Sequence, residues 1–572
     1  MSTSAPQTPK HYVIVGGVAG GMSAATRLRR LDEHATITVL ERSGHVSFAN
    51  CGLPYHVGGV IEKRSALLLQ TPASLGARFN LDVRVRTEAV AIDTARQVVR
   101  VRDLAAQAAA EAAHADGDDA VYEETAYETE LPYDALVLSP GARPVRPPIP
   151  GIERALTLRD IEDTDALVAA TAGARTAVVV GGGFIGVEVA ENLLHRGLTV
   201  TLVEATPQVL APLDPEMVAP VHAAMRKAGI DLRLGVSVTD IGADDVTLAD
   251  GIRVPADVVV AAIGVRPDAS LASAAGLALG PGGGIAVDGQ FRTSDPHVYA
   301  VGDAVEKVDA LSGGSGLVPL ANTANLQGRR VADVIAGMPS ADRPVLGTAI
   351  VGVLGLQVAA TGWNEKRLRA AGRAYRAIHT HPASHATYYP GADGMALKLL
   401  VDPETDAILG AQGVGRSGVD KRIDVIATAM AGGLPASALA ELELAYAPQF
   451  GSAKDAVNML GWVAENLRLG IARSVQWHEV AAAVEAGARV LDVRTPREFS
   501  RGSLPGAINV PVDSLRERLA DVPGPEVPLI VTCAVGVRGH VASRMLRQLG
   551  WDDVRNLDGG YTTWRAGMDA SS

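Results

Sequence analysis

The sequence contains two cysteines, Cys51 and Cys533, and each lies in a setting that favours chemistry over packing. Cys51 lies in the polar segment SFANCG, which lacks the pattern of a core strand. Cys533 ends the apolar run PLIVTC and opens the loop CAVGVR, which precedes a helical pattern. Thiolates are the nucleophiles of thiol–disulfide exchange, and two isolated cysteines exclude a disulfide-stapled secreted protein. We therefore interpret both residues as candidate sulfur nucleophiles.

Two glycine-rich turns favour dinucleotide binding. GGVAGG and GGGFIG each follow an apolar run and precede a helical pattern, so their glycines would let the backbone approach a pyrophosphate at a helix N-terminus. In the first turn Val18 replaces the second glycine of the G-x-G-x-x-G fingerprint, whereas the second turn is complete. The candidate contacts are Gly16, Gly17, Gly20 and Gly21 in the first turn and Gly181, Gly183 and Gly186 in the second.

Acidic residues follow at the positions where a dinucleotide ribose is bound. Glu41 ends the run TITVLE and Glu204 ends the run TVTLVE, so each carboxylate could accept ribose hydroxyls. A carboxylate at Glu204 would also repel a 2′-phosphate, which favours NADH over NADPH. Gly302 and Asp303 close a further strand-like run, HVYAVGDA. In flavoproteins with two dinucleotide sites, a similar motif holds the ribityl and phosphate portion of FAD.

The elements that must position these residues predict an α/β protein. The succession of strand, glycine turn, helix and strand occurs twice, which predicts two Rossmann-like dinucleotide-binding domains. Residues 104–130 are rich in Ala, Glu and Asp, and we interpret them as a solvated surface excursion that forms a hairpin. Residues 336–466 mix short strands with helices, and a further small α/β unit begins near residue 472.

Charge and composition exclude several classes of partner. Lys and Arg number 52 against 64 Asp and Glu, giving a net charge of −12, and aromatic residues are only 4%. A nucleic-acid partner would need a basic face and stacking platforms, so we expect none. The N-terminal ten residues lack an apolar signal core, and no run of about 18 apolar residues occurs, so we expect no membrane partner and a cytoplasmic location.

On these motifs, residues 11–466 resemble the pyridine nucleotide–disulfide oxidoreductase family, which binds FAD first and NAD(P)H second. Most members have a C-x-x-x-x-C redox pair, whereas SFANCGLPY resembles the single-cysteine branch of coenzyme A disulfide reductases, persulfide reductases, NADH oxidases and NADH peroxidases. The oxidases and peroxidases have a histidine in the first glycine turn, and this chain has none there. HATYYPGA and AYAPQFGSAKD resemble the coenzyme A disulfide reductases instead.

This resemblance implies the roles of further residues. Cys51 would attack an external disulfide or persulfide and form a mixed disulfide, which two electrons then reduce. Tyr388 and Tyr446 would reach the reacting sulfur from the partner subunit of a homodimer, as the matching tyrosines do in the family. Coenzyme A, as bound substrate or cofactor, needs polar and cationic contacts. The positions that match the family's coenzyme A contacts are Ser23, Arg27, Arg30, Ser47, Asn50 and Lys454.

Residues 472–572 resemble a rhodanese domain, on the segments LDVRTPREFSRGSLPGAINVP and TCAVGVRGHVASRML. Backbone N–H groups of the loop would then surround the Cys533 sulfur and stabilise a persulfide anion. Arg538 is also expected in this catalytic loop. A cysteine phosphatase would place its arginine six positions after the cysteine, whereas Arg538 lies five after Cys533. We expect Asp492 and Arg494 to order the domain through an internal ion pair.

The combined prediction is two Rossmann-like domains, an α+β dimerisation domain and a C-terminal rhodanese α/β domain. Its function would be FAD-dependent, NADH-driven reduction of coenzyme A persulfide, polysulfide or coenzyme A disulfide, with sulfane sulfur carried on Cys533 and sulfide released. Two alternatives stay open: an NADH oxidase or peroxidase that cycles through a Cys51 sulfenic acid, and a sulfur carrier serving a biosynthetic partner. The expected ranges are 1–155 and 286–335 for FAD binding, 156–285 for NADH binding, 336–466 for dimerisation and 472–572 for rhodanese.

We predict no catalytic or metal-binding role for three histidines and two basic residues. His379, His381 and His385 lie close together in the sequence, but no cysteine or carboxylate motif completes a zinc site, so we expect no metal. We interpret them as strand and loop residues beside the coenzyme A cleft. Lys421 and Arg422 are interpreted as the solvated start of a helix.

Overall fold

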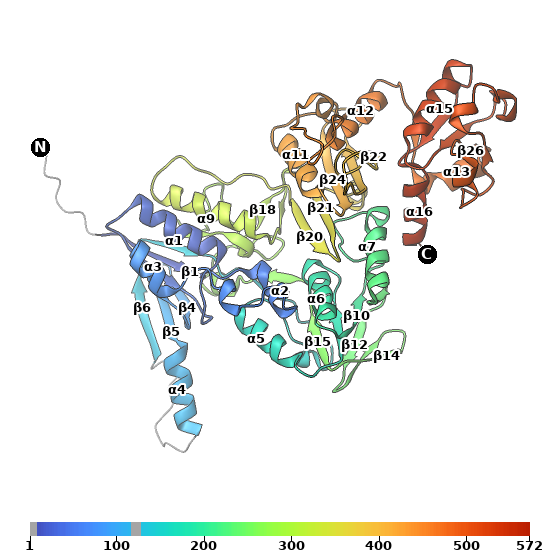
Figure 1. Cartoon of the computed structure of the whole chain (residues 1–572). Helices are drawn as coiled ribbons and strands as arrows, with labels where there is room; N and C mark the ends of the chain where they lie inside the picture. Colours follow the sequence, from blue (N-terminus) through green and yellow to red (C-terminus); the bar gives the residue numbers. More distant parts are fainter. Residues whose placement is uncertain (1–8, 116–126, 572) are drawn as a thin grey trace, which may run out of the picture. The chain divides into compact units, whose positions relative to one another are not determined.

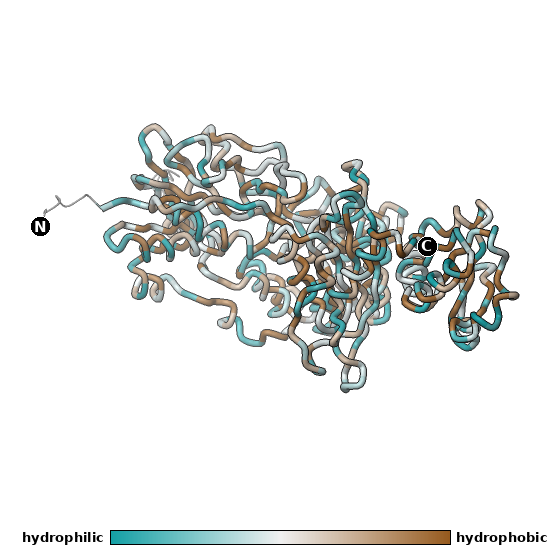
Figure 2. The backbone as a smooth tube through the Cα atoms, turned by 90° about the horizontal axis from the view of Figure 1, so that it is seen from above, coloured by the Kyte–Doolittle hydropathy of each residue, from teal (hydrophilic) through white to brown (hydrophobic). Residues whose placement is uncertain are grey.

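The computed structural model describes residues 9–115 and 127–571, which form two compact units (Figure 1). The first unit comprises the described residues up to 205 together with 236–345, and the second comprises 206–235 together with 346–571. Hydrophobic stretches recur along the whole described chain in Figure 2, as several separate cores require.

The first dinucleotide-binding region of unit 1 is a three-layer structure around a parallel sheet in the order β17-β7-β1-β2-β3. Helices α1 and α9 pack on one face, and the antiparallel sheet β4-β5-β6 packs on the other. The inner strands are buried because both faces are covered. The bounds are β1 His11–Val15, α1 Ala19–Leu31, β2 Thr36–Leu40, β3 Asp82–Arg84, β4 Thr87–Asp93, β5 Val98–Asp103, β6 Glu128–Pro132, β7 Ala135–Leu138, β17 Val298–Ala300 and α9 Ala321–Ile335.

The second dinucleotide-binding region of unit 1 repeats this plan with β10, β9 and β15 in parallel. A small antiparallel sheet, β12-β13-β14, shares its core. Helix α6 follows the second glycine turn, and α2 lies against α6. The bounds are α2 Leu53–Val57, α5 Ile161–Ala170, β9 Thr176–Val180, α6 Phe184–His195, β10 Thr199–Glu204, β12 Val238–Ile241, β13 Asp245–Leu248, β14 Arg253–Pro255 and β15 Val258–Ala261.

Unit 2 contains an antiparallel five-stranded sheet in the order β20-β21-β24-β23-β22. Helices α11 and α12 contribute to its core, and α10 follows β21. The helix α7 lies against β24 and α16. The bounds are α7 Pro215–Ala228, β20 Ala349–Val353, β21 Leu356–Gly362, α10 Glu365–Ala370, β22 Arg376–Thr380, β23 Met395–Val401, β24 Ile408–Gly415, α11 Val419–Ala431 and α12 Ala456–Arg468.

The C-terminal part of unit 2 is a parallel sheet in the order β25-β29-β28-β26-β27. Cys533 directly follows β28, and α15 begins after its loop. The bounds are β25 Ser474–Val475, α13 Val480–Glu485, β26 Arg489–Asp492, α14 Pro496–Phe499, β27 Ile508–Asn509, β28 Leu529–Thr532, α15 Val537–Gln548, β29 Val554–Leu557 and α16 Gly560–Ser571.

The predicted α/β fold is confirmed, and one local prediction is wrong. Residues 104–115 form the helix α4, Leu104–Ala115, instead of part of a hairpin, and its described side chains at 104–112 are mostly exposed as expected. Residues 128–130 of the same prediction lie in β6, which pairs antiparallel with β5. Alanine has the highest helix propensity, and Asp103 Oδ1 accepts hydrogen bonds from the first backbone N–H groups of the helix at 2.9 and 3.0 Å. The part of that prediction at 116–126 lies outside the described residues.

Candidate active site

The first glycine-rich turn lies between β1 and α1 and is tightly packed at two glycines. A Cβ atom on Gly16 would lie 2.0 Å from the Ser139 carbonyl oxygen, and one on Gly21 would lie 1.9 Å from the Gly16 carbonyl oxygen. Val18 has a φ of −117°, so it lies outside the left-handed region that favours glycine. The valine therefore fits the turn although it departs from the fingerprint.

Glu41 follows β2 and binds the first turn directly. Its Oε2 atom accepts a hydrogen bond from the Gly17 N–H at 2.8 Å, and its Oε1 atom accepts one from the Ser43 N–H at 2.8 Å. Burial raises the pKa of the Glu41 carboxyl, and these two hydrogen bonds act in the opposite direction. The carboxylate is thus fixed beside the turn, where a dinucleotide ribose is expected.

Gly302 and Asp303 lie directly beyond β17, in the same unit. The Gly302 N–H donates to Gln327 Oε1 at 3.0 Å. Asp303 Oδ1 is buried and has no hydrogen-bond partner among the described residues, and Lys307 Nζ lies 3.7 Å from it. Burial also raises the pKa of Asp303. A buried acceptor without a donor costs about 1–3 kcal/mol, so this atom fits a cofactor hydroxyl such as those of the FAD ribityl chain.

In the second glycine-rich turn, two glycines are packed tightly against the backbone, whereas a third faces open space. A Cβ atom on Gly186 would lie 1.9 Å from the Gly181 carbonyl oxygen, and one on Gly181 would lie 2.4 Å from the Ala262 carbonyl oxygen. A Cβ atom on Gly183 would meet no described protein atom within 4 Å. Gly183 precedes α6, so the open side lies at the helix N-terminus, where a pyrophosphate would fit.

Glu204 binds the second turn as Glu41 binds the first. Its Oε2 atom accepts a hydrogen bond from the Gly182 N–H at 2.7 Å. Gly17 and Gly182 occupy the same place in their turns, one residue after the first glycine of each. The two sites thus share one arrangement, in which a carboxylate at the end of a parallel strand is held against the glycine turn.

Cys51 lies in a single 3-10 turn, Asn50–Gly52, that leads into α2, and the residue is exposed. The pKa of its thiol is raised by partial burial and by the carboxylates of Glu188 and Asp303. Glu188 lies on α6 and accepts a hydrogen bond from the Tyr55 hydroxyl at 2.9 Å. The thiol therefore lies within the electrostatic reach of both the Asp303 site and the helix that follows the second glycine turn.

The predicted coenzyme A positions in unit 1 lie on two segments. Ser23, Arg27 and Arg30 belong to α1, whereas Ser47 and Asn50 precede Cys51; the Ser47 N–H donates to the Gly17 carbonyl oxygen at 2.8 Å, beside the start of α1. The Arg27 guanidinium pairs with Asp333 at 2.7 Å, and Ser23 donates to Asn325 at 2.6 Å. Arg30 is exposed. Lys454 lies in unit 2.

Tyr388 and Tyr446 are brought together within unit 2, although 58 positions separate them. Their hydroxyl oxygens lie 2.7 Å apart, and the side chains are 75% and 47% exposed. This hydrogen bond is the main cause that raises the pKa of Tyr446. Two exposed phenols that share one hydrogen bond are free to receive or donate a second one to an incoming group.

Arg422 corrects a prediction, because the helix start on α11 is not solvated there. Arg422 is 2% exposed and donates to Asp455 Oδ2 and to the Ser384 carbonyl oxygen, both at 3.0 Å. Asp455 also caps α12 through the Val457 N–H. The buried arginine thus joins the segment before Tyr388 to the segment that follows Tyr446.

Cys533 is the first residue of the loop that joins the strand β28 to the helix α15. The thiol is 1% exposed, and its sulfur accepts a hydrogen bond from the Gly536 N–H at 3.1 Å. Arg538 forms two hydrogen bonds with Glu498, at 2.8 and 2.6 Å, and a hydrogen bond to Cys533 is among the causes that raise its own pKa. Arg538 holds the pKa of Glu498 at about 2. Glu498 was missed from the sequence.

The predicted ion pair between Asp492 and Arg494 is confirmed. Arg494 Nη2 lies 2.6 Å from Asp492 Oδ2, and both side chains are buried. The guanidinium also lies 4.3 Å from the centre of the Tyr561 ring and donates to the Gly502 carbonyl oxygen at 2.7 Å. The pair therefore joins the ends of β26, the following loop and the start of α16.

The three histidines have separate partners. His379, on β22, contacts Asp558 and Glu216; His381 contacts the Thr563 hydroxyl at 2.7 Å; His385 packs edge-on against Tyr389. The carboxylates of Asp214, Glu216 and Glu365 are close enough together to hold a cation. The Lys398 ammonium lies among all three, 2.9 Å from Asp214, so a side chain of the protein already supplies the positive charge.

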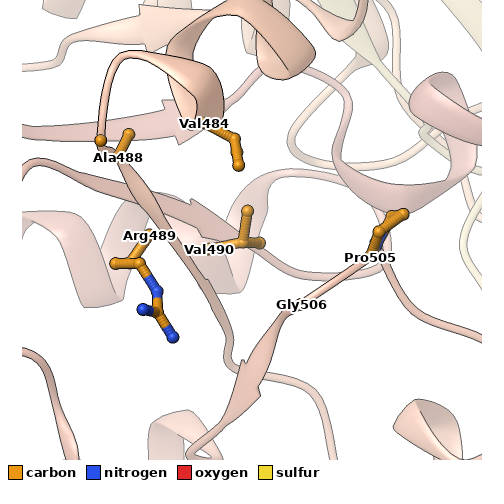
Figure 3. A pocket seen from close by; sticks show the side chains of 7 residues that line it. Val484, Ala488, Arg489, Val490, Pro505 and Gly506 are labelled. Atoms are coloured by element: carbon orange, nitrogen blue, oxygen red, sulfur yellow. The ribbon is translucent and has the colours of Figure 1, made fainter.

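Two cavities lie in unit 2. One of about 440 Å³ is lined by Val484, Val490 and Pro505, with Arg489 as its charged side chain, and has no thiol, hydroxyl or carboxylate in its lining (Figure 3). The other, of about 510 Å³, is lined by Val535 of the Cys533 loop and by Met217, His381 and Arg416, among other residues.

Across the described residues, the structure contains no helix that is long and apolar enough to cross a membrane.

Comparisons with known proteins match three segments of the chain to family profiles. The profile of the pyridine nucleotide-disulphide oxidoreductase family matches residues 10–328, and that of its dimerisation domain matches residues 348–457. The profile of rhodanese-like domains matches residues 476–567. A coenzyme A disulfide reductase of Staphylococcus haemolyticus is 33% identical over 461 residues, which cover 80% of this chain and 100% of that protein.

Two solved structures resemble nearly the whole chain. The reduced Bacillus anthracis CoADR-RHD has 44% identity and a TM-score of 0.93, with 98% of this chain and 99% of that chain covered. An NAD-dependent persulfide reductase from A. fulgidus has 36% identity and a TM-score of 0.88, with 97% of this chain and 100% of that chain covered.

Proposed function

Because this chain belongs to the pyridine nucleotide-disulphide oxidoreductase family, we propose that it uses NADH to reduce the sulfur–sulfur bond of coenzyme A persulfide, polysulfide or coenzyme A disulfide. The chain is a disulfide- or persulfide-reducing oxidoreductase with a rhodanese domain. The identity of the substrate, the use of NADH rather than NADPH and the roles of single residues are proposed in addition to this general activity.

The observation that carries the proposal is the arrangement of the two cysteines. Cys51 lies near Asp303 and α6 in the dinucleotide-binding unit, and Cys533 lies in a separate loop of unit 2. Because these are the only cysteines of the sequence and neither has another cysteine five positions away, no C-x-x-x-x-C pair is present. The second sulfur of any reducible bond at Cys51 would then come from the substrate.

The family implies FAD and a pyridine nucleotide, and the two glycine turns fit them. We propose that the first turn, Glu41 and Asp303 hold FAD, since Asp303 offers a buried acceptor without a donor among the described residues. The second turn and Glu204 would hold NADH, since Gly183 leaves room at the N-terminus of α6. FAD, when bound, relays the electron pair of the nicotinamide to sulfur.

At Cys51, the proposed reaction is thiol–disulfide exchange. The thiolate attacks the inner sulfur of a persulfide R–S–S–H, the S–S bond breaks, and HS⁻ leaves while a mixed disulfide Cys51–S–S–R forms. Two electrons and one proton then return the Cys51 thiolate and release R–SH. The sum is NADH + H⁺ + R–S–S–H → NAD⁺ + R–SH + H₂S. In a dimer, the phenolic hydrogen that the hydrogen bond between Tyr388 and Tyr446 leaves unused would be donated to the leaving sulfur.

At Cys533, the proposed step is sulfur transfer without electrons. The thiolate attacks the outer sulfur of a donor persulfide R–S–S–H, the S–S bond breaks, and R–S⁻ leaves while the persulfide Cys533–S–S–H forms. An acceptor thiolate then attacks the outer sulfur of this persulfide and releases the Cys533 thiolate. The Gly536 N–H already donates to the sulfur, and Arg538 is held beside it by Glu498. Both groups bring positive or partly positive charge to the sulfur, which would stabilise the anion of the Cys533 persulfide.

The proposal is tested by an anaerobic assay of NADH oxidation over coenzyme A persulfide, polysulfide, glutathione persulfide and coenzyme A disulfide. We expect the coenzyme A substrates to have the highest kcat/KM and sulfide to form from the persulfides. A parallel assay with oxygen and peroxide tests the oxidase and peroxidase alternative. Faster NADH oxidation with either of these oxidants than with every sulfur substrate would contradict the proposal.

A further inference from the structure

A network of buried charges joins the rhodanese part of unit 2 to the antiparallel sheet. Its members are His379 on β22, Lys398 on β23, Asp214 and Glu216 at the start of α7, Glu365 on α10 and Asp558 after β29. All six side chains are no more than 6% exposed. Charges are buried at a large cost unless they are paired, so each contact here constrains the elements that it joins.

His379 is placed between two carboxylates. Its Nδ1 atom lies 2.5 Å from Asp558 Oδ2, and its Nε2 atom lies 3.0 Å from Glu216 Oε1. A neutral imidazole has one N–H, and a carboxylate only accepts, so both contacts are satisfied only by an imidazolium that donates from both nitrogens. The backbone N–H of His379 also donates to Asp558 Oδ2 at 2.9 Å.

Asp558 opens a segment that reaches the Cys533 loop within three residues. The Tyr561 N–H donates to the Cys533 carbonyl oxygen at 2.8 Å, and the Thr562 N–H donates to the Ala534 carbonyl oxygen at 3.0 Å. The segment therefore provides two backbone hydrogen bonds to the loop that carries the sulfur.

Two glycines let this segment fit between His379 and the loop. A Cβ atom on Gly559 would lie 2.0 Å from Thr563 Oγ1 on α16 and 2.9 Å from His379 Cβ. One on Gly560 would lie 2.6 Å from the Cys533 carbonyl oxygen and 2.8 Å from the Gly536 nitrogen, whose N–H donates to the Cys533 sulfur. Close packing on both sides means that a displacement of Asp558 is transmitted to the loop.

We propose that His379 is a positioning residue for sulfur transfer, because its imidazolium holds Asp558 and thereby keeps residues 558–562 against the Cys533 loop. This inference rests on the proposed role of Cys533 and goes beyond it, since His379 belongs to β22 of the antiparallel sheet and not to the rhodanese part.

The protonation of His379 makes the contact sensitive to pH. Burial alone would lower the pKa of His379, but the Asp558 carboxylate and the hydrogen bonds to Asp558 and Glu216 raise it to about 9. Lys398 acts against this rise, and His381 is a further neighbour whose own pKa is lowered to about 4. Because the pKa of His379 lies above its ordinary value of 6.5, both ring hydrogen bonds are present below pH 6.5, and one of them is lost together with the positive charge as the pH rises through about 9.

The test measures how fast iodoacetamide alkylates Cys533 in the full chain. A Cys51→Ser background leaves Cys533 as the only thiol, and His379→Gln is added to it. Because Cys533 is 1% exposed, a loosened loop exposes it, and we expect alkylation about tenfold faster at pH 7. Parent and variant are compared at each pH, and the ratio of their rates should fall as the pH rises through about 9, where His379 of the parent also loses its charge.

His222→Gln is the matched control. His222 is as buried as His379, at 4% exposure, and lies on α7 in the same unit, but it accepts a hydrogen bond from the Val209 N–H instead of holding Asp558. We expect it to leave the alkylation rate unchanged. Asp558→Asn is expected to accelerate alkylation as His379→Gln does, and it carries the test if His379→Gln is not recovered folded.

The double variant shows whether the two residues act through one contact. We expect His379→Gln with Asp558→Asn to accelerate alkylation no more than the stronger single variant, because both remove the same interaction. The inference would be overturned if the accelerations of the two single variants multiplied in the double variant. An unchanged rate in His379→Gln, or an equal acceleration in His222→Gln, would also overturn it. Alkylation needs no sulfur-transfer activity, so the proposed function can fail in its own assay while this result stands.

Discussion

At the scale of single residues, the environment of Cys51 opposes the thiolate that the proposed reaction needs. Glu188 and Asp303 both add to the effect of burial in raising the pKa of the thiol. Asp303 is assigned to the cofactor site, so Glu188 is the carboxylate whose charge can be removed more selectively. The Tyr55 hydroxyl that donates to Glu188 can still donate to the amide oxygen of a glutamine.

We therefore expect Glu188→Gln to lower the pKa of Cys51 and to speed its alkylation at pH 7 by about two- to fivefold, because a nearby negative charge disfavours the thiolate. The rate is measured with iodoacetamide in a Cys533→Ser background. Glu153→Gln, at an exposed carboxylate that is not among the causes acting on Cys51, is the control. An equal rate in the Glu188 variant and its parent would contradict this electrostatic account.

A second prediction at the scale of single residues concerns Glu204. Its carboxylate is held against the second glycine turn by the Gly182 N–H and would face the ribose of the nicotinamide cofactor. Glu204→Arg replaces a group that repels a 2′-phosphate with one that attracts it, so we expect kcat/KM to rise about tenfold for NADPH and to fall for NADH. Steady-state kinetics with both cofactors checks this. A wild-type preference for NADPH would show that the assignment is wrong.

The residues that sequence reasoning found and missed differ in a simple way. Glycines, cysteines and strand-end glutamates are found because a local motif fixes their setting, as in GGGFIG or TVTLVE. Glu188 and Glu498 were missed because each meets its partner only after folding: Glu188 is 133 positions from Tyr55, and Glu498 is 40 positions from Arg538. Glu188 lies in the helix α6, directly after the second glycine fingerprint, and this position in the sequence was the signal that could have identified it.

At the scale of elements, the glycine turns show which glycines hold the fold and which leave room for a ligand. Gly186 and Gly183 lie three residues apart, at and before the start of α6. A Cβ atom at Gly186 would collide with the Gly181 carbonyl oxygen, whereas one at Gly183 would meet no described protein atom. The same substitution at the two sites therefore separates stability from binding.

We expect Gly186→Ala to lower the free energy of unfolding by several kcal/mol, because the 1.9 Å contact forces α6 away from the turn. Gly183→Ala should keep the wild-type melting temperature but raise KM for NADH about tenfold, because the new methyl group occupies the space of the pyrophosphate. Thermal unfolding and NADH kinetics of both variants test this pair. A wild-type KM in a folded Gly183→Ala variant would place the pyrophosphate elsewhere.

Element prediction succeeded where the chain alternates apolar strands with glycine turns and failed where composition was the only guide. The runs TAVVV and LIVT became β9 and β28 as expected. The Ala-rich segment of α4 was interpreted from its polar composition, although its helix propensity and the cap at Asp103 point to a helix. Arg422 was likewise expected in solvent, because its partner Asp455 lies 33 positions away.

At the scale of the whole molecule, we expect a homodimer with shared active sites. The match to a dimerisation domain at residues 348–457 supports assembly, and the exposed pair Tyr388 and Tyr446 lies at residues expected to reach the partner's site. Phe450, which is 72% exposed, follows close behind Tyr446 in the sequence. Exposed aromatic side chains of this kind are typical of protein interfaces.

Shared sites predict complementation between two inactive parents. A dimer of one Cys51→Ser protomer and one Tyr388→Phe/Tyr446→Phe protomer would contain one intact site, because the intact Cys51 then faces intact tyrosines. Random reassociation makes half of the dimers mixed, so we expect about a quarter of the wild-type activity. Each parent reassociated with itself is the control. Activity no higher than the mean of the parents, or an active monomer by sedimentation, would contradict shared sites.

The most direct test of the central claim, that the two cysteines do separate work, compares two variants in two assays. The first assay follows anaerobic NADH oxidation and sulfide release with coenzyme A persulfide, and the second follows sulfur transfer from thiosulfate. We predict that Cys51→Ser loses the first activity and keeps the second, whereas Cys533→Ser keeps the first, at one sulfide per NADH, and loses the second. Reductase activity in Cys51→Ser, or unchanged kinetics in both assays for Cys533→Ser, would contradict the account.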